Sequence, residues 1–266
     1  KHNNLTLAML GVLSSSISLG VSLSPSANAA EFRNTFTSRI AFGETAAQNA
    51  KQSDEIDTVM FSNSLTSELS QTAGDNWKIF FRWTLHNETK DLLEPSEPDD
   101  AQVRSTMSRR LFFSDNTDLE FREVYIDGYM GDAFVRAGKQ QVVWGQADGF
   151  RVLDLINPMN LREFILEDSE DRRIPTWLLN IEIPVGNWTT QFLWIPDNTY
   201  DQTPSLTEQA RFAPSSPRFV PQPSSGSAVT INDAEKPDRI FSDSDAGIRF
   251  TNFINGWDVS INYLYH

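Results

Sequence analysis

Apolar and polar residues alternate along many segments of the chain, and this period of two is typical of β-strands with one apolar and one polar face. The clearest segment begins at Trp77, where Trp77, Ile79 and Phe81 alternate with Lys78 and Arg82. Such segments number about nine. They cover residues 32–44, 58–72, 77–88, 118–129, 133–142, 175–185, 188–196, 244–254 and 257–266. The alternation therefore predicts an all-β fold of antiparallel strands.

The connections between the predicted strands alternate in length. The short ones are residues 73–76, 130–132, 186–187 and 255–256. The long ones are residues 45–57, 89–117, 143–174 and 197–243. Bacterial outer-membrane barrels have short turns at one end and long loops at the other. The pattern predicts an antiparallel transmembrane β-barrel, incomplete in this chain and present as an open sheet.

The N-terminal region has the composition of a secretory signal. An apolar run ends at Leu23 and is followed by Ala27-Asn28-Ala29, which is a small-residue cleavage site. We therefore expect residues 1–29 to be a signal peptide and residues 30–266 to be the N-terminal part of one barrel domain. Location in the outer membrane of a Gram-negative bacterium follows as an expectation. Because the chain begins with Lys1, we expect its start to precede this sequence.

Aromatic residues recur beside the tight turns and partway along the strands. Those that we expect at the lipid interface are Trp77, Trp83, Trp177, Trp188, Trp194, Trp257 and Tyr263. Trp and Tyr favour the boundary between membrane and water, because their rings are apolar and each carries one polar hydrogen. The alternative is that these rings form the core of a soluble β protein.

Charge restricts where the polar side chains of a barrel can point. A charge on the lipid face costs about 2 to 4 kcal/mol at the bilayer midplane. We therefore expect a group of strand residues to face the lumen: Lys78, Arg82, Arg122, Glu123, Asp127 and Arg136. The formal net charge of −14 argues against nucleic acid as a partner, because phosphate binding needs a basic surface.

Two of the long connections have distinctive compositions. Residues 143–174 carry apolar residues near helical spacing, so we expect short helical turns inserted into the barrel mouth. Charged residues of this segment are Arg151, Asp154, Arg162, Glu163, Arg172 and Arg173. They lie close in sequence to the acidic residues Glu167, Asp168, Glu170 and Asp171. They form either a selective constriction or structural ion pairs. Residues 197–243 are rich in Pro and Ser and predict an extended outer loop, and residues 89–103 predict a solvated one.

Catalytic and cofactor motifs are not recognisable in the sequence. His86 would be the one base available for a Ser-His-Asp site, and there is no Gly-x-Ser-x-Gly motif. The acidic residues 167–171 lack the spacing of a calcium loop. The chain has no Cys, which excludes disulfides and thiolate chemistry. We expect neither an enzyme nor a bound metal or cofactor.

Four runs carry a resemblance to a known family: Gly138-Lys139-Gln140-Gln141-Val142-Val143-Trp144-Gly145-Gln146-Ala147-Asp148-Gly149, Asp154-Leu155-Ile156-Asn157-Pro158, Arg162-Glu163-Phe164 and Arg173-Ile174-Pro175-Thr176-Trp177. Together they resemble a proteobacterial family of outer-membrane barrels catalogued under a domain of unknown function. The resemblance implies a wide porin-type barrel encoded near components that transport lipids or other hydrophobic compounds. Members of that family are longer, which implies that further C-terminal strands lie beyond this sequence.

Two functions remain open from the sequence. The first is an outer-membrane porin-like channel, or a component of a lipid transport system, for small hydrophobic or amphipathic solutes. Its partners would be outer-membrane lipid, a small-molecule or lipidic cargo and a periplasmic transport partner. The second is a secreted soluble β-sandwich binding module of carbohydrate type, with Trp as binding platforms. The first needs an open sheet with a continuous apolar outer face, and the second needs a closed two-layer core.

Overall fold

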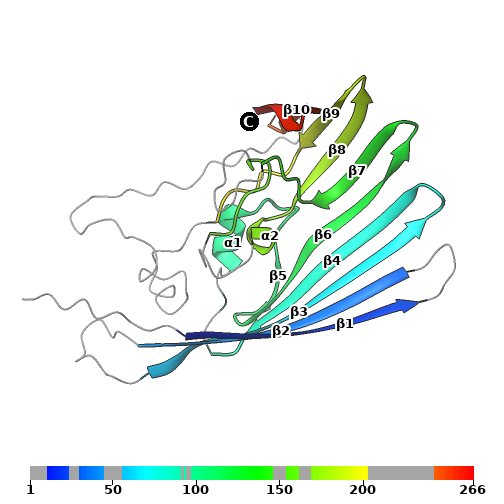
Figure 1. Cartoon of the computed structure of the whole chain (residues 1–266). Coiled ribbons are helices and arrows are strands. Elements are labelled where there is room, and N and C mark those ends of the chain that lie inside the picture. The colour runs from blue at the N-terminus through cyan, green and yellow to red at the C-terminus, as the bar shows by residue number, and fades with distance from the viewer. Residues whose placement is uncertain are drawn as a thin grey trace, which may run out of the picture.

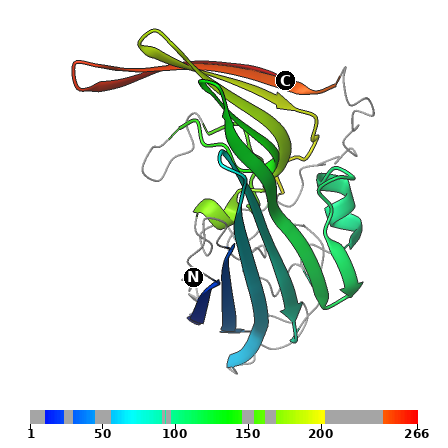
Figure 2. The same ribbon diagram turned by 90° about the vertical axis from the view of Figure 1, so that its right-hand side faces the viewer.

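The computed structural model describes residues 11–23, 30–44, 56–90, 93, 97–145, 154–161, 169–202 and 243–266. These residues form one antiparallel sheet of 11 strands, in which the main order is β1-β2-β3-β4-β6-β7-β8-β9-β10-β11 and β5 pairs with β6 (Figure 1). The sheet is curved and is not closed, and β1 and β11 are its two end strands (Figures 1 and 2). The predicted all-β antiparallel sheet is therefore confirmed.

The strands are β1 (Gly11–Leu23), β2 (Ala30–Glu44), β3 (Ile56–Ala73), β4 (Trp77–Glu88), β5 (Leu111–Ser114), β6 (Thr117–Met130), β7 (Ala133–Gln140), β8 (Thr176–Val185), β9 (Trp188–Ile195), β10 (Asp245–Ile254) and β11 (Trp257–Tyr265). The described helices are α1 (Glu97–Val103) and α2 (Ser169–Arg172). Among the described residues, no helix is long and apolar enough to cross a bilayer.

The tight turns predicted from the sequence are present, and they lie at one end of the sheet, where neighbouring strands are joined (Figure 1). Each contains a glycine with positive φ: Gly74, Gly131, Gly186 and Gly256. Glycine adopts this backbone conformation without a steric penalty, which allows each strand to reverse within a few residues. Both helices lie near the opposite ends of the strands, where the long connections begin and end.

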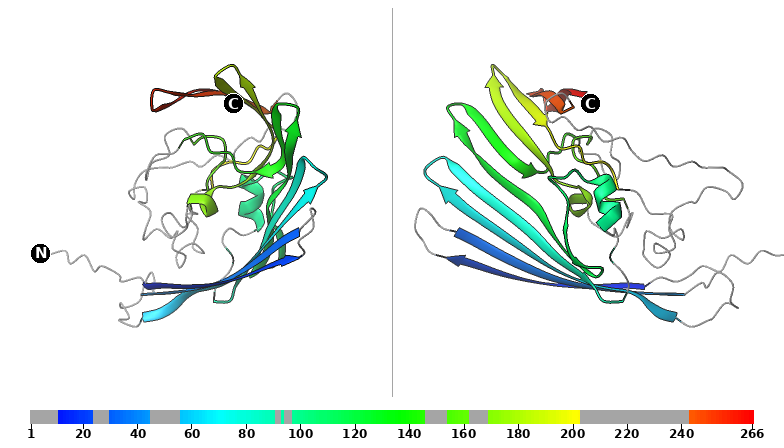
Figure 3. Two further views of the ribbon diagram at one scale, coloured as in Figure 1. Left: turned by 45° about the vertical axis from the view of Figure 1, so that its right-hand side comes forward. Right: turned by 180° about the vertical axis from the view of Figure 1, so that it is seen from behind.

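The two faces of the sheet differ in chemistry because side chains alternate along each strand. The face toward α2 and residues 141–145 is the concave face, and it carries Lys78 and Arg82 (Figures 2 and 3). The convex face carries the other parity of β4. Its exposed apolar residues include Ile17, Leu19, Phe32, Phe36, Ile79, Phe121, Ile126, Val185, Phe192, Trp194, Phe250, Trp257, Ile261, Tyr263 and Tyr265. The exposed side chains on the outside of the sheet are therefore largely apolar.

The N-terminal segment differs from the expectation that it lies outside the fold. Gly11–Leu23 forms β1, which pairs with β2 along its whole length. The reason is an alternation within the apolar run: Ser16 and Ser18 fall on one parity, and Ile17 and Leu19 on the other. Ser18 lies on the concave face, where its hydroxyl is 3.1 Å from that of Thr35. Cleavage and export of this segment stay predictions.

The connection between β4 and β6 also differs from the expected solvated loop. It contains α1 and the short strand β5, and Leu93 and Asp100 within it are buried. Its ordering comes from contacts with distant parts of the chain, such as the backbone hydrogen bond from Tyr200 to Val103. Residues 97–103 have no apolar stripe that would mark a helix in the sequence. Tertiary contacts stabilise the helix instead.

Candidate functional site

A row of alternating charges crosses the concave face. Arg33, Glu68, Arg82 and Glu123 lie in register on β2, β3, β4 and β6. Arg82 is 2.7 Å from a carboxylate oxygen of Glu68 and 3.4 Å from one of Glu123. Arg33 is 3.5 Å from Glu68 at the outer end of the row. These ion pairs are part-exposed, so water and salt screen them and solutes can compete for them.

A second row lies nearer to the tight turns. Lys78, Asp127, Arg136 and Asn180 are in register on β4, β6, β7 and β8. Asp127 accepts hydrogen bonds from two nitrogens of Arg136, at 3.0 and 2.7 Å. The side chain of Lys78 is exposed. Lys78, Arg82, Glu123, Asp127 and Arg136 therefore lie on one face of the sheet, and that this face lines a lumen stays a prediction.

Aromatic rings occupy concave positions beside this second row. Phe80 and Tyr125 stack with ring centroids 5.1 Å apart, and Tyr129 and Phe134 meet edge to face at 5.5 Å. The guanidinium of Arg136 lies over Tyr125 at 4.4 Å and over Phe134 at 5.5 Å. A cation over an aromatic face is attracted by the negative charge of the π system. Rings on a polar face are not predicted by simple alternation.

The opposite end of the concave face is filled by residues from the long connections. Asn157 is 1% exposed and hydrogen-bonds to four partners. Its side-chain oxygen accepts from the backbone of Val142, and its amide donates to the carbonyl oxygens of Gln140 and Ile174 and to the hydroxyl of Thr176. One side chain thus joins the end of β7 to the start of β8.

Asp197 joins several segments of the chain in a similar way. Its carboxylate accepts hydrogen bonds from the hydroxyls of Ser108 and Thr199 and from the backbone of Trp177. Trp177 also donates its indole N–H to the carbonyl oxygen of Met107. The buried carboxylate therefore ties β8 to the segment after β9 and to the segment after α1.

A buried ion-pair cluster joins α1 to β6. Asp100 pairs with Arg104 and Arg110, Arg104 donates to Glu120 at 2.6 Å, and Arg110 donates to Asp118. Burial would lower the pKa of Arg104, but the adjacent carboxylates of Glu120 and Asp100 hold it above its ordinary value. The arginine is therefore charged at every physiological pH, and the cluster anchors this connection.

An apolar cluster packs the inserted segment onto the sheet. Trp144 lies against Gly247, where an added Cβ would come within 2.8 Å of the indole ring. The indole N–H donates to Gln191 on β9 at 2.7 Å. The other members of the cluster are Val142, Ile156, Leu178, Leu193 and Ile195. Together with the hydrogen bonds of Asn157 and Asp197, this packing fixes the inserted segments inside the curve of the sheet.

A family model described as "protein of unknown function (DUF1302)" matches residues 9–265. The chain belongs to the DUF1302 family. No curated protein and no solved structure gives a significant match to it. The predicted membership of a family of unknown function is confirmed, while the outer-membrane character that the resemblance implied stays a proposal.

In this DUF1302 protein, some of the charges predicted for residues 143–174 can be placed. Arg151, Arg162 and Glu163 lie outside the described residues. Arg173 pairs with Asp154 at 2.7 Å. The described helix in this segment is the four-residue α2, which ends at Arg172. A selective role for these charges stays a prediction.

Arg122 differs from the other predicted strand charges of the DUF1302 chain. It falls where the β4–β6 register shifts, between the pairs Arg82–Glu123 and Trp83–Phe121. Its guanidinium donates to the carbonyl oxygens of Asp171 and Arg173. The bulge thus aims Arg122 at the inserted segment, and no feature of the sequence pattern predicts such a bulge.

The aromatic residues of the DUF1302 chain that were predicted for an interface lie mainly on the convex face. Trp257 and Tyr263 are 75% and 64% exposed, and Trp194 is 36% exposed. Trp77, Trp83 and Trp188 are half-buried on the same face by their register. Trp177 differs because its indole N–H is used by Met107. Its role in the structure is to hold a connection.

His and acidic side chains were the candidates for metal and catalytic chemistry in this DUF1302 protein. Among the described residues, no group of three or more His, Asp or Glu side chains could hold a metal ion. His86 on β4 lies in register with Asp118, and Asp118 pairs with Arg110. The absence of enzymatic activity stays a prediction.

Proposed function

We propose that this protein is an outer-membrane porin-like channel for small hydrophobic or amphipathic solutes. The observation that carries the proposal is the division of a single curved sheet into an exposed apolar convex face and a charged concave face. An exposed apolar surface of this extent is unfavourable in water and favourable against lipid. The concave charges would then line the lumen.

The order of the connections supports the same function. Transmembrane barrels have tight turns at one end of the sheet and long connections at the other, and this chain has the same arrangement. The segments joined by Asn157 and Asp197 would narrow the lumen near the end with the long connections. A soluble sandwich needs two packed layers, whereas the described strands form one sheet.

The function can be tested in a planar lipid bilayer. Protein purified from outer membranes should give stable conductance steps after reconstitution, and deletion of residues 143–174 should enlarge them if the deleted protein still folds. A milder variant keeps the fold: Glu68→Gln removes a concave negative charge, so the reversal potential in a KCl gradient should shift toward anion selectivity. Ser260→Ala, on the concave side of β11 outside the charged rows, is the control. Protein that remains soluble in the periplasm and forms no steps would contradict the channel.

A further inference from the structure

We propose that the concave face carries a binding site for small amphipathic carboxylates, formed by Lys78 and Arg136 with the rings of Phe80, Tyr125 and Phe134. The proposal rests on the proposed channel and names a class of solute for it. Neither the alternation of the strands nor the ion-pair rows requires rings at these positions. A solute with an apolar body and one negative group would use both features.

The row of Lys78, Asp127 and Arg136 has an excess of positive charge, and the nearby carboxylate of Glu182 accepts hydrogen bonds from the amides of Asn180 and Gln191. Asp127 is the carboxylate of its row, and both of the hydrogen bonds that it accepts come from Arg136. Lys78, the cross-strand neighbour of Asp127, is exposed and forms no ion pair with a described residue. Two cations therefore face one carboxylate, and Lys78 together with the remaining edge of Arg136 can bind a second carboxylate from solution.

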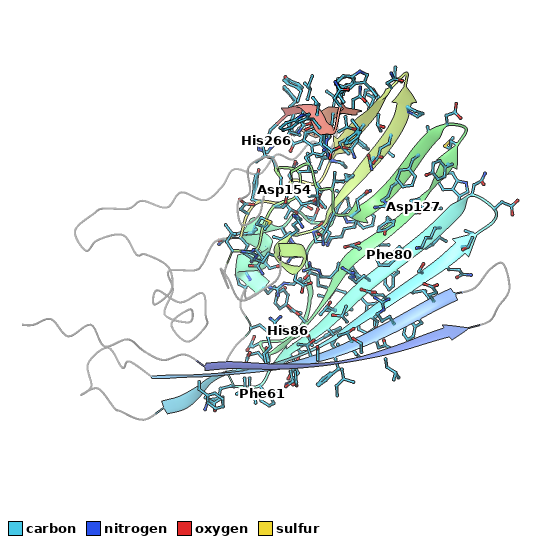
Figure 4. All side chains as sticks on the ribbon, viewed as in Figure 1. Phe61, Phe80, His86, Asp127, Asp154 and His266 are labelled. Atoms are coloured by element: carbon cyan, nitrogen blue, oxygen red, sulfur yellow. The ribbon has the colours of Figure 1, made fainter. Side chains whose placement is uncertain are left out.

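The rings provide apolar surface on both sides of these charges. The Phe80 and Tyr125 pair lies on the side nearer to the long connections, and Phe134 with Tyr129 lies on the side nearer to the turns. Each ring of the first pair is half-buried, so part of its surface remains open. Figure 4 shows Phe80 and Asp127 on the sheet, with Asp127 toward the tight turns.

A glycine lies opposite Tyr125. Gly138 on β7 has φ +132, a conformation that other residues rarely adopt. An added Cβ would clash with the Val124 carbonyl oxygen and come within 2.7 Å of the Tyr125 Cα, so the two strands approach closely here. The neighbour of the Tyr125 ring on β7 is therefore the Arg136 guanidinium, at 4.4 Å.

The neighbouring row sets the limits of this selectivity. Arg82 lies between Glu68 and Glu123, and Arg33 pairs with Glu68, so the two cations and two carboxylates of that row balance. An anion is therefore favoured at Lys78 and Arg136 rather than at the neighbouring row. Solutes that share a ring and differ only in the sign of their charge should differ at Lys78 and Arg136.

The test compares block of the reconstituted channel by three probes with one ring: 4-phenylbutyrate, 4-phenylbutanol and 4-phenylbutylamine. We expect phenylbutyrate to block at the lowest concentration. Lys78→Gln and Tyr125→Leu should each raise its half-blocking concentration about tenfold, because each removes one partner of the solute. The double variant Arg136→Gln with Asp127→Asn, which removes both partners of one ion pair, should do the same.

Two controls separate the site from general effects. Arg33→Gln removes a concave cation outside the site, and Phe192→Leu removes a ring from the convex face, so neither should change the block by phenylbutyrate. Normal conductance steps with equal block by all three probes, or with equal sensitivity in the control variants, would overturn the site and leave the channel standing. A protein that forms no steps would overturn the proposed function and this site with it.

Discussion

The concave face is built differently at its two ends. Near the tight turns, the charged rows around Arg82 and Asp127 are part-exposed and pair across neighbouring strands. Near the long connections, Asn157 and Asp197 are buried and bind segments that are distant in sequence. Exposed ion pairs contribute up to about 1 kcal/mol each, whereas an unsatisfied buried polar group costs about 1 to 3 kcal/mol. The first end is therefore suited to solutes, and the second maintains the shape.

Substitutions at the two ends should therefore have different effects. A change at the buried end should lower the free energy of unfolding and leave charge selectivity unchanged. A change at the open end should alter charge selectivity and leave the free energy of unfolding almost unchanged.

The largest effect is expected for Asn157→Ala. The substitution removes hydrogen bonds to Gln140, Ile174 and Thr176 and leaves their buried groups unpaired. The free energy of unfolding in urea, measured in detergent micelles by tryptophan fluorescence, should fall by about 3 kcal/mol. Asn252→Ala, on the convex side of β10, is the control and should change it little. Equal losses for both variants would contradict the distinction.

Asp197→Ala should have the next largest effect. Three donors lose their acceptor, including the backbone N–H of Trp177 and the hydroxyl of Ser108. We expect a loss of about 2 kcal/mol in the same assay. Asp258→Ala on exposed β11 removes the same group from water and should be nearly neutral. If Asp258→Ala were as damaging, burial would not explain the effect.

The sequence pattern predicts the open end of the concave face better than the buried end. The open end follows from alternation, because Lys78, Arg82, Asp127 and Arg136 all fall on the predicted polar parity. The buried end depends on partners far apart in sequence, such as Ser108 and Asp197, and a local pattern carries no information about such pairs. Asp100 looked like part of a solvated acidic run for this reason.

The N-terminal strand was not predicted for a different reason. Its alternation is present in the sequence, since Ser16 and Ser18 flank Ile17 with a period of two. The composition of a signal segment and that of an apolar strand overlap, so composition alone does not separate them. The rings of Phe80 and Tyr125 were missed because aromatic residues fit either face of a strand.

A smaller effect on stability is expected for Gly247→Ala. The new methyl group would meet the indole of Trp144, which must shift because its neighbours are closely packed. The free energy of unfolding should fall by about 1 to 2 kcal/mol, and the near-ultraviolet circular dichroism should change. Ala246→Ser lies on the exposed opposite face of the same strand and should alter neither signal. An unchanged spectrum for Gly247→Ala would contradict the packing of Trp144.

Arg82→Gln should have the smallest effect on stability and a measurable effect on selectivity. Its ion pairs are part-exposed, so the loss should be at most about 1 kcal/mol. Removing the cation leaves Glu68 with Arg33 alone and Glu123 without its Arg82 partner, so the reversal potential in a KCl gradient should shift toward cation selectivity. Adding Glu68→Gln to the same variant should reverse the shift. A large loss of stability without a shift would place Arg82 with the buried end.

Labelled cysteines can show whether the convex face meets lipid and the concave face meets water. The chain has no Cys, so single cysteines at residues 78–84 can each carry an environment-sensitive fluorophore. In lipid vesicles, labels at Ile79 and Phe81 should emit at shorter wavelength and resist quenching by iodide, while those at Lys78 and Thr84 should be quenched. An alternation with a period of two is the predicted result. Quenching of every label to the same extent would contradict the account.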